Sequence, residues 1–404
     1  MSTKLSRLIP ALLLVLVVSS AIVLILSLVK RQNVFLPSSN KYGMVFDAGS
    51  SHTSLFVYQW AADKENDTGV VSQTLSCDVQ GPGISAYASD PPKAGASLRS
   101  CLEEALKIIP AESHREVPAY LGATAGMRLL SIENRSAADQ VLNEVTKTIQ
   151  QYPVNFRGAR IITGEEEGTY GWITINYLLD SFTQYSPRQR DWIHPQSAKI
   201  LGALDLGGAS TQISFIPKGP IVDQTKAAKF RLYGYDYTIY TQSYLCYGQT
   251  QALKQLLLKL TEAFSAFYYT FSFLNLTGGQ SLAEVEAAVQ KFCARNWTDL
   301  KSSYPKEKEK WLLEYCSNAN YILVLLLDAY KFNQTSWSSV KFQMKAANTD
   351  IGWTLGYMLN LTNMIPAEAL VQVNGQQYGL WIAGIFVIVL TLVLCLVGLL
   401  MYLL

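Results

Sequence analysis

The stretch 203-ALDLGGASTQIS-214 joins an apolar run and an acidic residue to two glycines, a hydroxyl cluster and a second apolar run. A similar stretch, 44-MVFDAGSSHTSLFV-57, occurs earlier in the chain. Aligned on their acidic residues, the copies match at three positions: Asp47 with Asp205, Gly49 with Gly207, and Thr53 with Thr211. The pattern of each copy predicts a strand, a tight turn and a second strand.

Both turns have the composition of an anion site. Glycine lets the backbone approach a ligand closely, and successive N–H groups in such a turn form a concave anion site. A carboxylate repels a phosphate unless a divalent cation lies between them, so Asp47 and Asp205 predict a shared Ca²⁺ or Mg²⁺, reached directly or through water. The alternative is two ordinary β-turns, in which Asp and Gly are common.

Two further stretches lie between the copies. In 120-YLGATAGMRLL-130 a strand end precedes a helical pattern, and Thr124 is placed to bind phosphate or a metal-bound water; the alternative is a turn without a ligand. In 161-IITGEEEGTYGWITINYLL-179 three glutamates precede an amphipathic helix. A glutamate beside a metal-bound phosphate can orient and deprotonate water. The sequence contains no Walker-type loop and no kinase motif set, so it favours phosphoryl transfer to water.

Two uncharged apolar stretches, 8–29 and 380–403, predict membrane-spanning helices. Each exceeds the ~20 residues that cross a bilayer. The alternative for the first is a cleaved signal peptide, although its apolar core is longer than is usual there. The alternative for the second is a lipid-anchor signal with Asn374-Gly375 as the processing site.

The segment between these stretches is expected to face the cell exterior. Six glycosylation sequons occur, all within it: Asn66, Asn134, Asn275, Asn296, Asn333 and Asn360. In an oxidising compartment we expect two disulfides, Cys77 with Cys101 and Cys293 with Cys316, which leaves Cys246 without an assigned partner. The net charge of +2 gives no pull toward nucleic acid, and three histidines disfavour a His-cluster zinc site.

Five stretches together resemble the conserved regions of the ectonucleoside triphosphate diphosphohydrolases, in the same order. They are DAGSSHTS, GATAGMRLL, ITGEEEGTYGW, DLGGASTQ and GWTLGYMLNLTN. The resemblance covers nearly the whole chain. It implies an α/β fold: a two-lobed actin-like, ribonuclease-H-like ectodomain between two transmembrane helices.

The resemblance also implies hydrolysis of extracellular nucleoside tri- and diphosphates such as ATP, ADP, UTP and UDP, with Ca²⁺ or Mg²⁺. Glu167, the glutamate before the second glycine, would be the base, and Ser210 and Gln212 would hold the attacking water. Metal would be organised by Asp47 and Asp205, with Thr124 and Trp353 nearby. Phosphate would be bound by Ser50, Ser51, His52, Thr53 and the amides of Gly207, Gly208 and Ala209. Tyr269 would stack on the base; an ordinary aromatic helix face is the alternative.

One family segment is missing. Cell-surface members carry a longer insertion after the region of Cys246, whereas this chain continues directly into 264-FSAFYY-269. The resemblance therefore implies a deletion after about residue 262, which would have held the partner of Cys246. The alternative function is a catalytically impaired isoform that acts as an inactive or regulatory membrane protein.

The expected organisation follows from these features. Its parts are a cytoplasmic N-terminus (1–7), a transmembrane helix (8–29), an extracellular nucleotidase domain (30–379) and a second transmembrane helix (380–403). Within the nucleotidase domain we expect lobe I at about 41–180, a shortened lobe II at about 181–345, and a return to lobe I at 346–379. The expected location is the plasma membrane, with homo-oligomers formed through the transmembrane helices.

Overall fold

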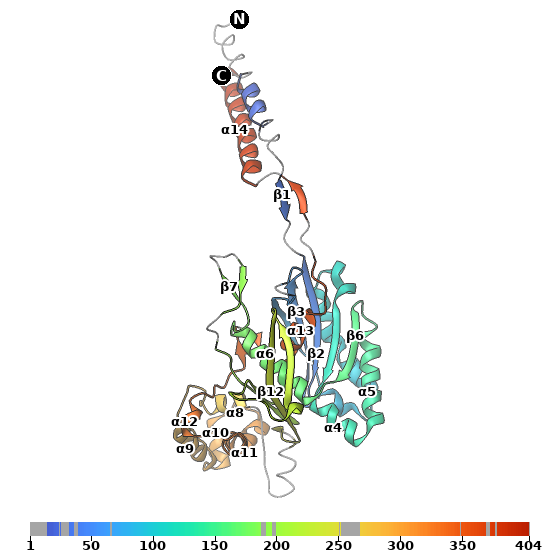
Figure 1. The fold of residues 1–404 in the computed structure, drawn as a ribbon, viewed down its shortest axis with the longest axis vertical. Coiled ribbons are helices and arrows are strands. Elements are labelled where there is room, and N and C mark those ends of the chain that lie inside the picture. The colour runs from blue at the N-terminus through green and yellow to red at the C-terminus, as the bar shows by residue number, and fades with distance from the viewer. Residues whose placement is uncertain are drawn as a thin grey trace. The chain divides into compact units, whose positions relative to one another are not determined.

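A computed structural model provides the fold (Figure 1). It describes residues 14–23, 25, 32–35, 39–64, 67–186, 191–195, 199–249, 251, 267–347, 349–368, 372–375 and 378–403. The chain forms two compact units. One is Asn40–Ala367; the other combines Met1–Ser39 with Glu368–Leu404. The central unit is thus narrower than the expected 30–379, because the segments that flank it pair with each other.

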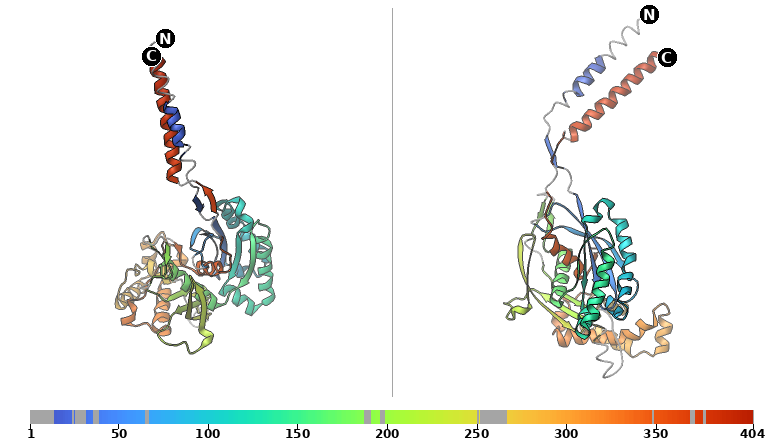
Figure 2. Two further views of the ribbon diagram at one scale, coloured as in Figure 1. Left: turned by 45° about the horizontal axis from the view of Figure 1, so that its top comes forward. Right: turned by 90° about the vertical axis from the view of Figure 1, so that its right-hand side faces the viewer.

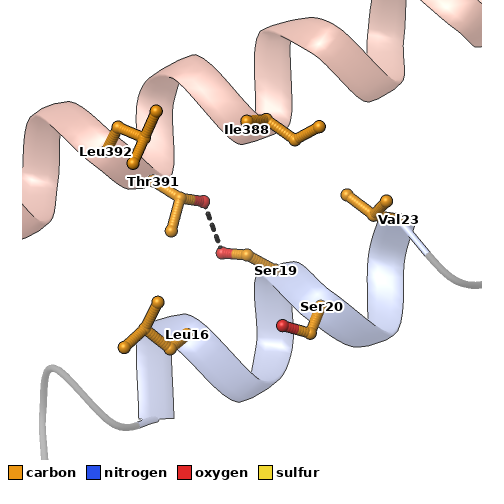
Figure 3. Close-up of a pocket in the computed structure, with 7 residues that line it drawn as sticks. All are labelled: Leu16, Ser19, Ser20, Val23, Ile388, Thr391 and Leu392. Carbon is orange, nitrogen blue, oxygen red and sulfur yellow. Dashed lines mark hydrogen bonds between the residues drawn. The ribbon is translucent and has the colours of Figure 1, made fainter.

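The terminal unit brings the two chain ends together. Strand β1 (Gln32–Phe35) pairs antiparallel with β15 (Gln372–Gly375), and the helical residues 14–23 lie beside α14 (Tyr378–Leu403). Thr391 Oγ1 lies 2.7 Å from Ser19 Oγ (Figure 3). A cavity of about 380 Å³ adjoins this pair; it is lined by Leu16, Ser19, Ser20, Val23, Ile388, Thr391 and Leu392.

Over the residues that the structure describes, no helix meets the length and hydropathy that a membrane crossing needs. The two predicted spans are therefore not confirmed.

The first lobe of the central unit is built on a five-stranded sheet in the order β4-β3-β2-β5-β6. The strands are β2 (Asn40–Ala48), β3 (Thr53–Ala61), β4 (Val71–Asp78), β5 (Pro118–Ala123) and β6 (Asn155–Ile161). The β2–β3 and β3–β4 pairs are antiparallel, and the β2–β5 and β5–β6 pairs are parallel. Parallel neighbours need crossover connections: the one from β5 to β6 is helical, and the one from β2 to β5 runs through β3, β4 and several helices.

Helices cover one face of this sheet (Figure 2). They are α2 (Pro91–Ser97), α3 (Arg99–Ile108), α4 (Ala125–Glu133) and α5 (Arg135–Ile149), with short turns η1 (Ile84–Tyr87) and η2 (Ala111–Glu116). Their apolar sides form one core with β2 and β5, in which Leu102, Val141 and Phe46 are fully buried. This is the α/β lobe that the resemblance implies.

The second sheet, in the order β11-β12-β10-β9, is antiparallel throughout. Its strands are β9 (Ala203–Leu206), β10 (Ser210–Phe215), β11 (Ala227–Leu232) and β12 (Tyr235–Leu245), with η3 (Gln224–Lys226) between β10 and β11. A small hairpin, β7 (Gln184–Ser186) and β8 (Asp191–Ile193), precedes it. Among the described residues this sheet has no parallel strand, in contrast to the first.

Two helices, α6 (Gly164–Leu178) and α13 (Trp353–Thr362), share a core with both sheets. That core contains Trp172 of α6, Met358 of α13, Tyr58 of the first sheet and Ile239 of the second. The two helices pack closely because Gly356 has no side chain: a Cβ there would overlap the carbonyl oxygen of Tyr170. The sites at the ends of both sheets are therefore positioned by one shared core.

A helical layer follows the second sheet. It consists of α8 (Phe267–Phe273), α9 (Leu282–Cys293), α10 (Trp297–Ser303), α11 (Glu309–Val324), η4 (Leu325–Ala329, a π-helical turn) and α12 (Gln334–Trp337). A short hairpin of two strands with two residues each, β13 (Lys345–Ala346) and β14 (Thr349–Asp350), leads on to α13.

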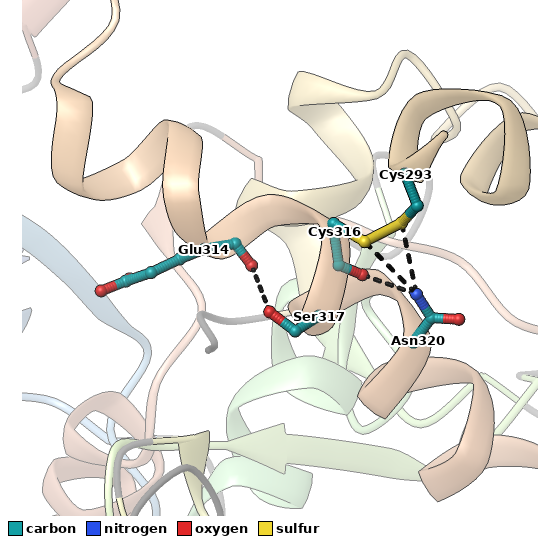
Figure 4. Close-up of a disulfide and its surroundings, with 5 residues drawn as sticks. All are labelled: Cys293, Glu314, Cys316, Ser317 and Asn320. Carbon is teal, nitrogen blue, oxygen red and sulfur yellow. Dashed lines mark hydrogen bonds between the residues drawn. A yellow bond between two sulfur atoms is a disulfide. The ribbon is translucent and has the colours of Figure 1, made fainter. Parts of the chain in front are cut away.

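Both predicted disulfides are confirmed. Cys77 on β4 is bonded to Cys101 on α3, and Cys293 on α9 is bonded to Cys316 on α11 (Figure 4). Cys246 is half-buried and takes part in neither of these disulfides. The first bond therefore ties a strand of the first sheet to a helix that covers it, and the second ties two helices together.

Candidate active site

The two hairpins predicted from the repeated sequence have the same register. Ala48 pairs with Thr53 across β2 and β3, and Leu206 pairs with Thr211 across β9 and β10. The loops are therefore residues 49–52 and 207–210, which confirms the alignment of the two copies. The acidic residue of each copy stands on the first strand, one position before the paired residue.

The first loop is open. Ser51 and His52 are exposed, and Ser51 Oγ lies 3.0 Å from His52 Nδ1. Thr53 is fully buried, and its hydroxyl has no hydrogen-bond partner among the described residues. Ser50 lies against α4, because a Cβ on Gly126 would come within 2.7 Å of the Ser50 Cα. The loop thus rests on the N-terminus of α4 and presents hydroxyl and imidazole groups outward.

The three glutamates of the GEEEG stretch have different surroundings. Thr163 caps α6, and Glu166 completes the capping box while pairing with Arg160 at 2.8 Å. Glu165 is half-buried, whereas Glu167 is only 6% exposed. The flanking glycines let α6 lie directly on the second sheet, where a Cβ on Gly168 would come 2.7 Å from the hydroxyls of Ser214 and Thr241. Glu167 is therefore the glutamate that points inward.

The structure brings Glu167, Ser210 and Gln212 together. Gln212 Nε2 donates to Glu167 Oε2 at 3.1 Å and to Ser210 Oγ at 2.8 Å. Ser243 on β12 extends the cluster, since its hydroxyl lies 3.0 Å from Gln212 Nε2. All three predicted residues are buried, so they form a polar cluster enclosed by protein.

Sequence reasoning missed Arg128, which joins this cluster from α4. Its Nη2 donates to Glu167 Oε2 at 2.7 Å and to Ser210 Oγ at 3.0 Å. The signal was present in GATAGMRLL, where a lone cation stands within an apolar helical pattern. A cation in that position is costly to bury unless it is paired.

The carboxylates of the site have raised pKa values. Burial raises the pKa of Glu167 to about 8; the Arg128 charge opposes this, and Asp205 and Asp47 add to it. Burial likewise raises the pKa of Asp47 to about 6, with Trp353 and His52 opposing and Asp205 adding. The pKa of Asp205 is also raised by burial, against the effect of Arg128. Three acidic groups therefore interact in one place, where a cation is favoured.

Trp353 and Thr124 border the same place. Trp353 is 2% exposed, and its six-membered ring lies against Gly122, where a Cβ would overlap the ring. Its indole approaches Asp47 without a well-formed hydrogen bond, so Trp353 Nε1 and Asp47 Oδ1 both lack partners. Thr124 is buried at the N-cap of α4, and its N–H donates to Ala48 at the end of β2.

Several buried polar atoms around the carboxylates have no hydrogen-bond partner among the described residues. They are Asp47 Oδ1, Thr53 Oγ1, Arg128 Nε, Gln212 Oε1 and Trp353 Nε1. Buried polar atoms are normally paired, so such a concentration marks a place where ligand or water completes the bonding. Within the described residues no group of three His, Cys, Asp or Glu side chains is spaced to hold a metal by itself.

The other predicted residues lie elsewhere. Tyr269 on α8 is 55% exposed, with its hydroxyl 3.4 Å from Met344 Sδ. Among the sequons, Asn66 lies outside the described residues, and four are exposed: Asn134, Asn275, Asn296 and Asn333. Asn360 is half-buried on α13 and its Thr362 is fully buried, which leaves less room for a glycan.

The two matched loops and the converging carboxylates lie within residues that a known protein-family model matches. The GDA1/CD39 (nucleoside phosphatase) family model matches residues 33–263 and 256–374. The chain therefore belongs to this family, and it is a nucleoside phosphate hydrolase by descent. The two matched segments meet at 256–263, where the sequence implied a deletion.

Similar proteins support the same assignment. Ectonucleoside triphosphate diphosphohydrolase 8 of Rattus norvegicus is 47% identical and that of Homo sapiens 43%, each with 93% of both chains covered. Ectonucleoside triphosphate diphosphohydrolase 2 of Rattus norvegicus is 41% identical, with 95% of this chain and 94% of that protein covered. The first alignment spans 463 positions, more than the 404 residues of the chain, so that relative carries residues that this chain lacks.

Proposed function

We propose that this protein hydrolyses extracellular nucleoside tri- and diphosphates to monophosphates and phosphate. The observation that carries the proposal is the buried cluster of Glu167, Ser210 and Gln212 beside two phosphate-type hairpins. The relatives that bear the diphosphohydrolase name cover nearly the whole chain, which supports the same substrate class.

The cluster suits the positioning of an attacking water. Arg128 and Gln212 both donate to Oε2 of Glu167, and we assign Oε1 to accept one proton of the water. The unpartnered Gln212 Oε1 accepts the other, and the Ser210 hydroxyl, which already accepts two N–H bonds, donates to the water oxygen. The remaining lone pair attacks phosphorus, Glu167 takes the proton, and the nucleotide oxygen leaves.

A hydrated Ca²⁺ or Mg²⁺ fits the residues present. Asp47 Oδ1 is an unpartnered buried acceptor, Asp205 interacts with it electrostatically, and Thr124 and Trp353 lie beside them. Mg²⁺ keeps several of its waters, so a site with few direct protein ligands is chemically reasonable. When bound, the cation neutralises phosphate charge. Because Asp47 and Asp205 both raise the pKa of Glu167, neutralising them also favours its basic form.

We further propose that the protein is anchored in the plasma membrane by 8–29 and 380–403, with the site outside the cell. The support is the uncharged sequence of both stretches and the four exposed sequons of the central unit. Homo-oligomers through these helices remain part of the proposal. Tyr269 is proposed to stack on the base, supported by its exposed ring.

The test is phosphate release from ATP and from ADP by intact cells that express the chain, with Ca²⁺ or Mg²⁺, normalised to surface-biotinylated protein. We expect metal-dependent release that Glu167→Gln lowers by about 10³-fold, within the 10²–10⁴ range of general-base catalysis. Glu165→Gln is the matched control and should release phosphate like the wild type.

The other outcomes would each contradict a different part of the proposal. Normal surface protein without release by the wild type would support an inactive or regulatory membrane protein. Chains that never reach the surface and keep endoglycosidase-H-sensitive glycans would show that the shortened second lobe impairs folding. Activity that persists in Glu167→Gln would show that Glu167 is not the general base.

A further inference from the structure

The second hairpin loop is hydrogen-bonded by the segment that follows β12, of which the structure describes residues 246–249 and 251. Three of its backbone N–H groups donate to three successive carbonyls of the loop: Cys246 to Ala209 (2.9 Å), Gln249 to Gly207 (2.9 Å) and Gln251 to Gly208 (3.2 Å). Gln249 Nε2 adds a bond to Leu206 O at 3.2 Å. The carbonyls of residues 207–209 thus all accept hydrogen bonds from one neighbouring segment.

These bonds fix the direction of the loop amides. In a trans peptide the N–H of one residue points opposite to the carbonyl of the residue before it. Binding the carbonyls of 207–209 therefore turns the N–H groups of Gly208, Ala209 and Ser210 away from the partners that hold those carbonyls. The N–H groups of Gly208 and Ala209 have no acceptor among the described residues, as an anion-binding turn requires.

Gly248 lets the segment come this close. A Cβ at Gly248 would overlap the backbone nitrogens of Ala209 and Ser210. The obstacle is main chain, which cannot rotate aside as a flexible side chain can. Gly248 is not among the positive-φ residues, so close approach and not backbone conformation explains the glycine.

Two tyrosines of the helical layer hold the segment and the hairpin together. The Tyr321 hydroxyl donates to the carbonyl of Tyr247 at 2.8 Å. The Tyr330 hydroxyl lies 2.8 Å from Thr211 Oγ1, which itself donates to Asp205 O at 2.8 Å. Tyr330 directly follows the π-helical turn η4, a feature often found at functional sites.

We propose that residues 246–249 and 251 form a positioning element that aims the amides of the second hairpin at the transferred phosphate, with Gly248 as its positioning residue. The tyrosine hydroxyls make the helical layer part of the same support. This inference rests on the proposed function, because it concerns the same phosphate.

The test compares Gly248→Ala with Gly219→Ala in the purified, detergent-solubilised full chain. Gly219 is a suitable control because a Cβ there meets nothing within 4 Å. We expect Gly248→Ala to lower kcat for ATP by about 10²-fold, the cost of a displacement of about 1 Å, with KM changed less. Thermal stabilisation by orthovanadate, a phosphate mimic, in the presence of Mg²⁺ should also be lost. The control should keep both.

The orthovanadate measurement separates this inference from the proposed function. If the wild type releases no phosphate but is stabilised by orthovanadate, and Gly248→Ala loses that stabilisation, the positioning role stands and the hydrolase proposal fails. A Gly248→Ala protein with the kcat and orthovanadate response of the wild type overturns the positioning role.

A double variant covers the case in which Gly248→Ala does not fold. Tyr321→Phe combined with Tyr330→Phe removes only two hydroxyl groups and keeps both rings. We expect kcat to fall by about tenfold, with the unfolding midpoint close to that of the wild type, since each lost bond displaces the loop less than an inserted methyl group. An unchanged kcat in this double variant would overturn the inference.

Discussion

The two hairpins share a register but differ in how they are supported. Thr53 and Thr211 occupy equivalent positions and both are fully buried. Among the residues that the structure describes, the Thr53 hydroxyl has no hydrogen-bond partner, whereas the Thr211 hydroxyl bonds to Asp205 O and Tyr330. The first loop exposes Ser51 and His52, while Ala209 and Ser210 of the second are at most 2% exposed.

The difference shows where a shortened chain is vulnerable. The first loop rests on α4 and on the loop around Gly83, both within a complete α/β lobe. The second is held by residues 246–249 and 251 and by the helical layer, which lie on opposite sides in the sequence of the place where the family match breaks. The first hairpin loop thus depends on the first lobe, and the second depends on segments that flank residues 256–263, where the family match breaks.

Among the variants that compare the two hairpins, the largest effect should come from removing either hairpin carboxylate. If Asp47 and Asp205 serve one cation, Asp47→Asn and Asp205→Asn should each lower metal-dependent phosphate release by about 10²-fold or more. The double variant should be little worse than either single one, because groups that act as a unit are not additive. The measurement is kcat over a range of Ca²⁺ and Mg²⁺ concentrations. If the fold-losses in kcat of the two single variants multiply in the double variant, the two hairpins act independently and do not serve one cation.

Arg128 provides a smaller and more specific effect, because it bonds to Ser210 of the second hairpin. Arg128→Gln removes a charge that lowers the pKa of Glu167. We expect kcat to fall by about tenfold and the acid limb of the pH–rate profile to move to higher pH. Arg128→Lys keeps the charge and should move that limb less. Equal profiles in all three proteins would exclude an electrostatic role for Arg128.

The sequence revealed the hairpins because their pattern is local. Strand alternation, the glycines and the Asp47–Asp205 match can be seen in short windows, and the predicted pairing of the strands is confirmed. Glu167 was selected among three glutamates by family resemblance, and its burial on α6 agrees with that selection. The role of Gly248 was not visible, because a close approach between residues 248 and 209 is a tertiary contact that no local pattern reports.

The smallest effect concerns stability without metal, and its pH dependence distinguishes Asp47 of the first hairpin from Glu167 of α6. The pKa of Asp47 rises from 3.8 to about 6 and that of Glu167 from 4.5 to about 8, so the folded chain binds both protons more tightly than the unfolded chain does. Their stabilising contribution is therefore complete below about pH 4 and is lost as pH rises, by about 6 for Asp47 and about 8 for Glu167.

In chelator, the unfolding midpoint of the detergent-solubilised chain should consequently fall by about 2–6 °C between pH 5 and pH 8. In Glu167→Gln the unfolding midpoint should fall less over the whole range up to pH 8. In Asp47→Asn it should fall less only in the lower part of the pH range, up to about pH 6. The control Glu165→Gln should show the same fall as the wild type. Adding Ca²⁺ or Mg²⁺ should raise the midpoint more at pH 8 than at pH 5, because the cation then meets ionised carboxylates. A decline that persists unchanged in Glu167→Gln would assign the pH dependence to groups outside this site.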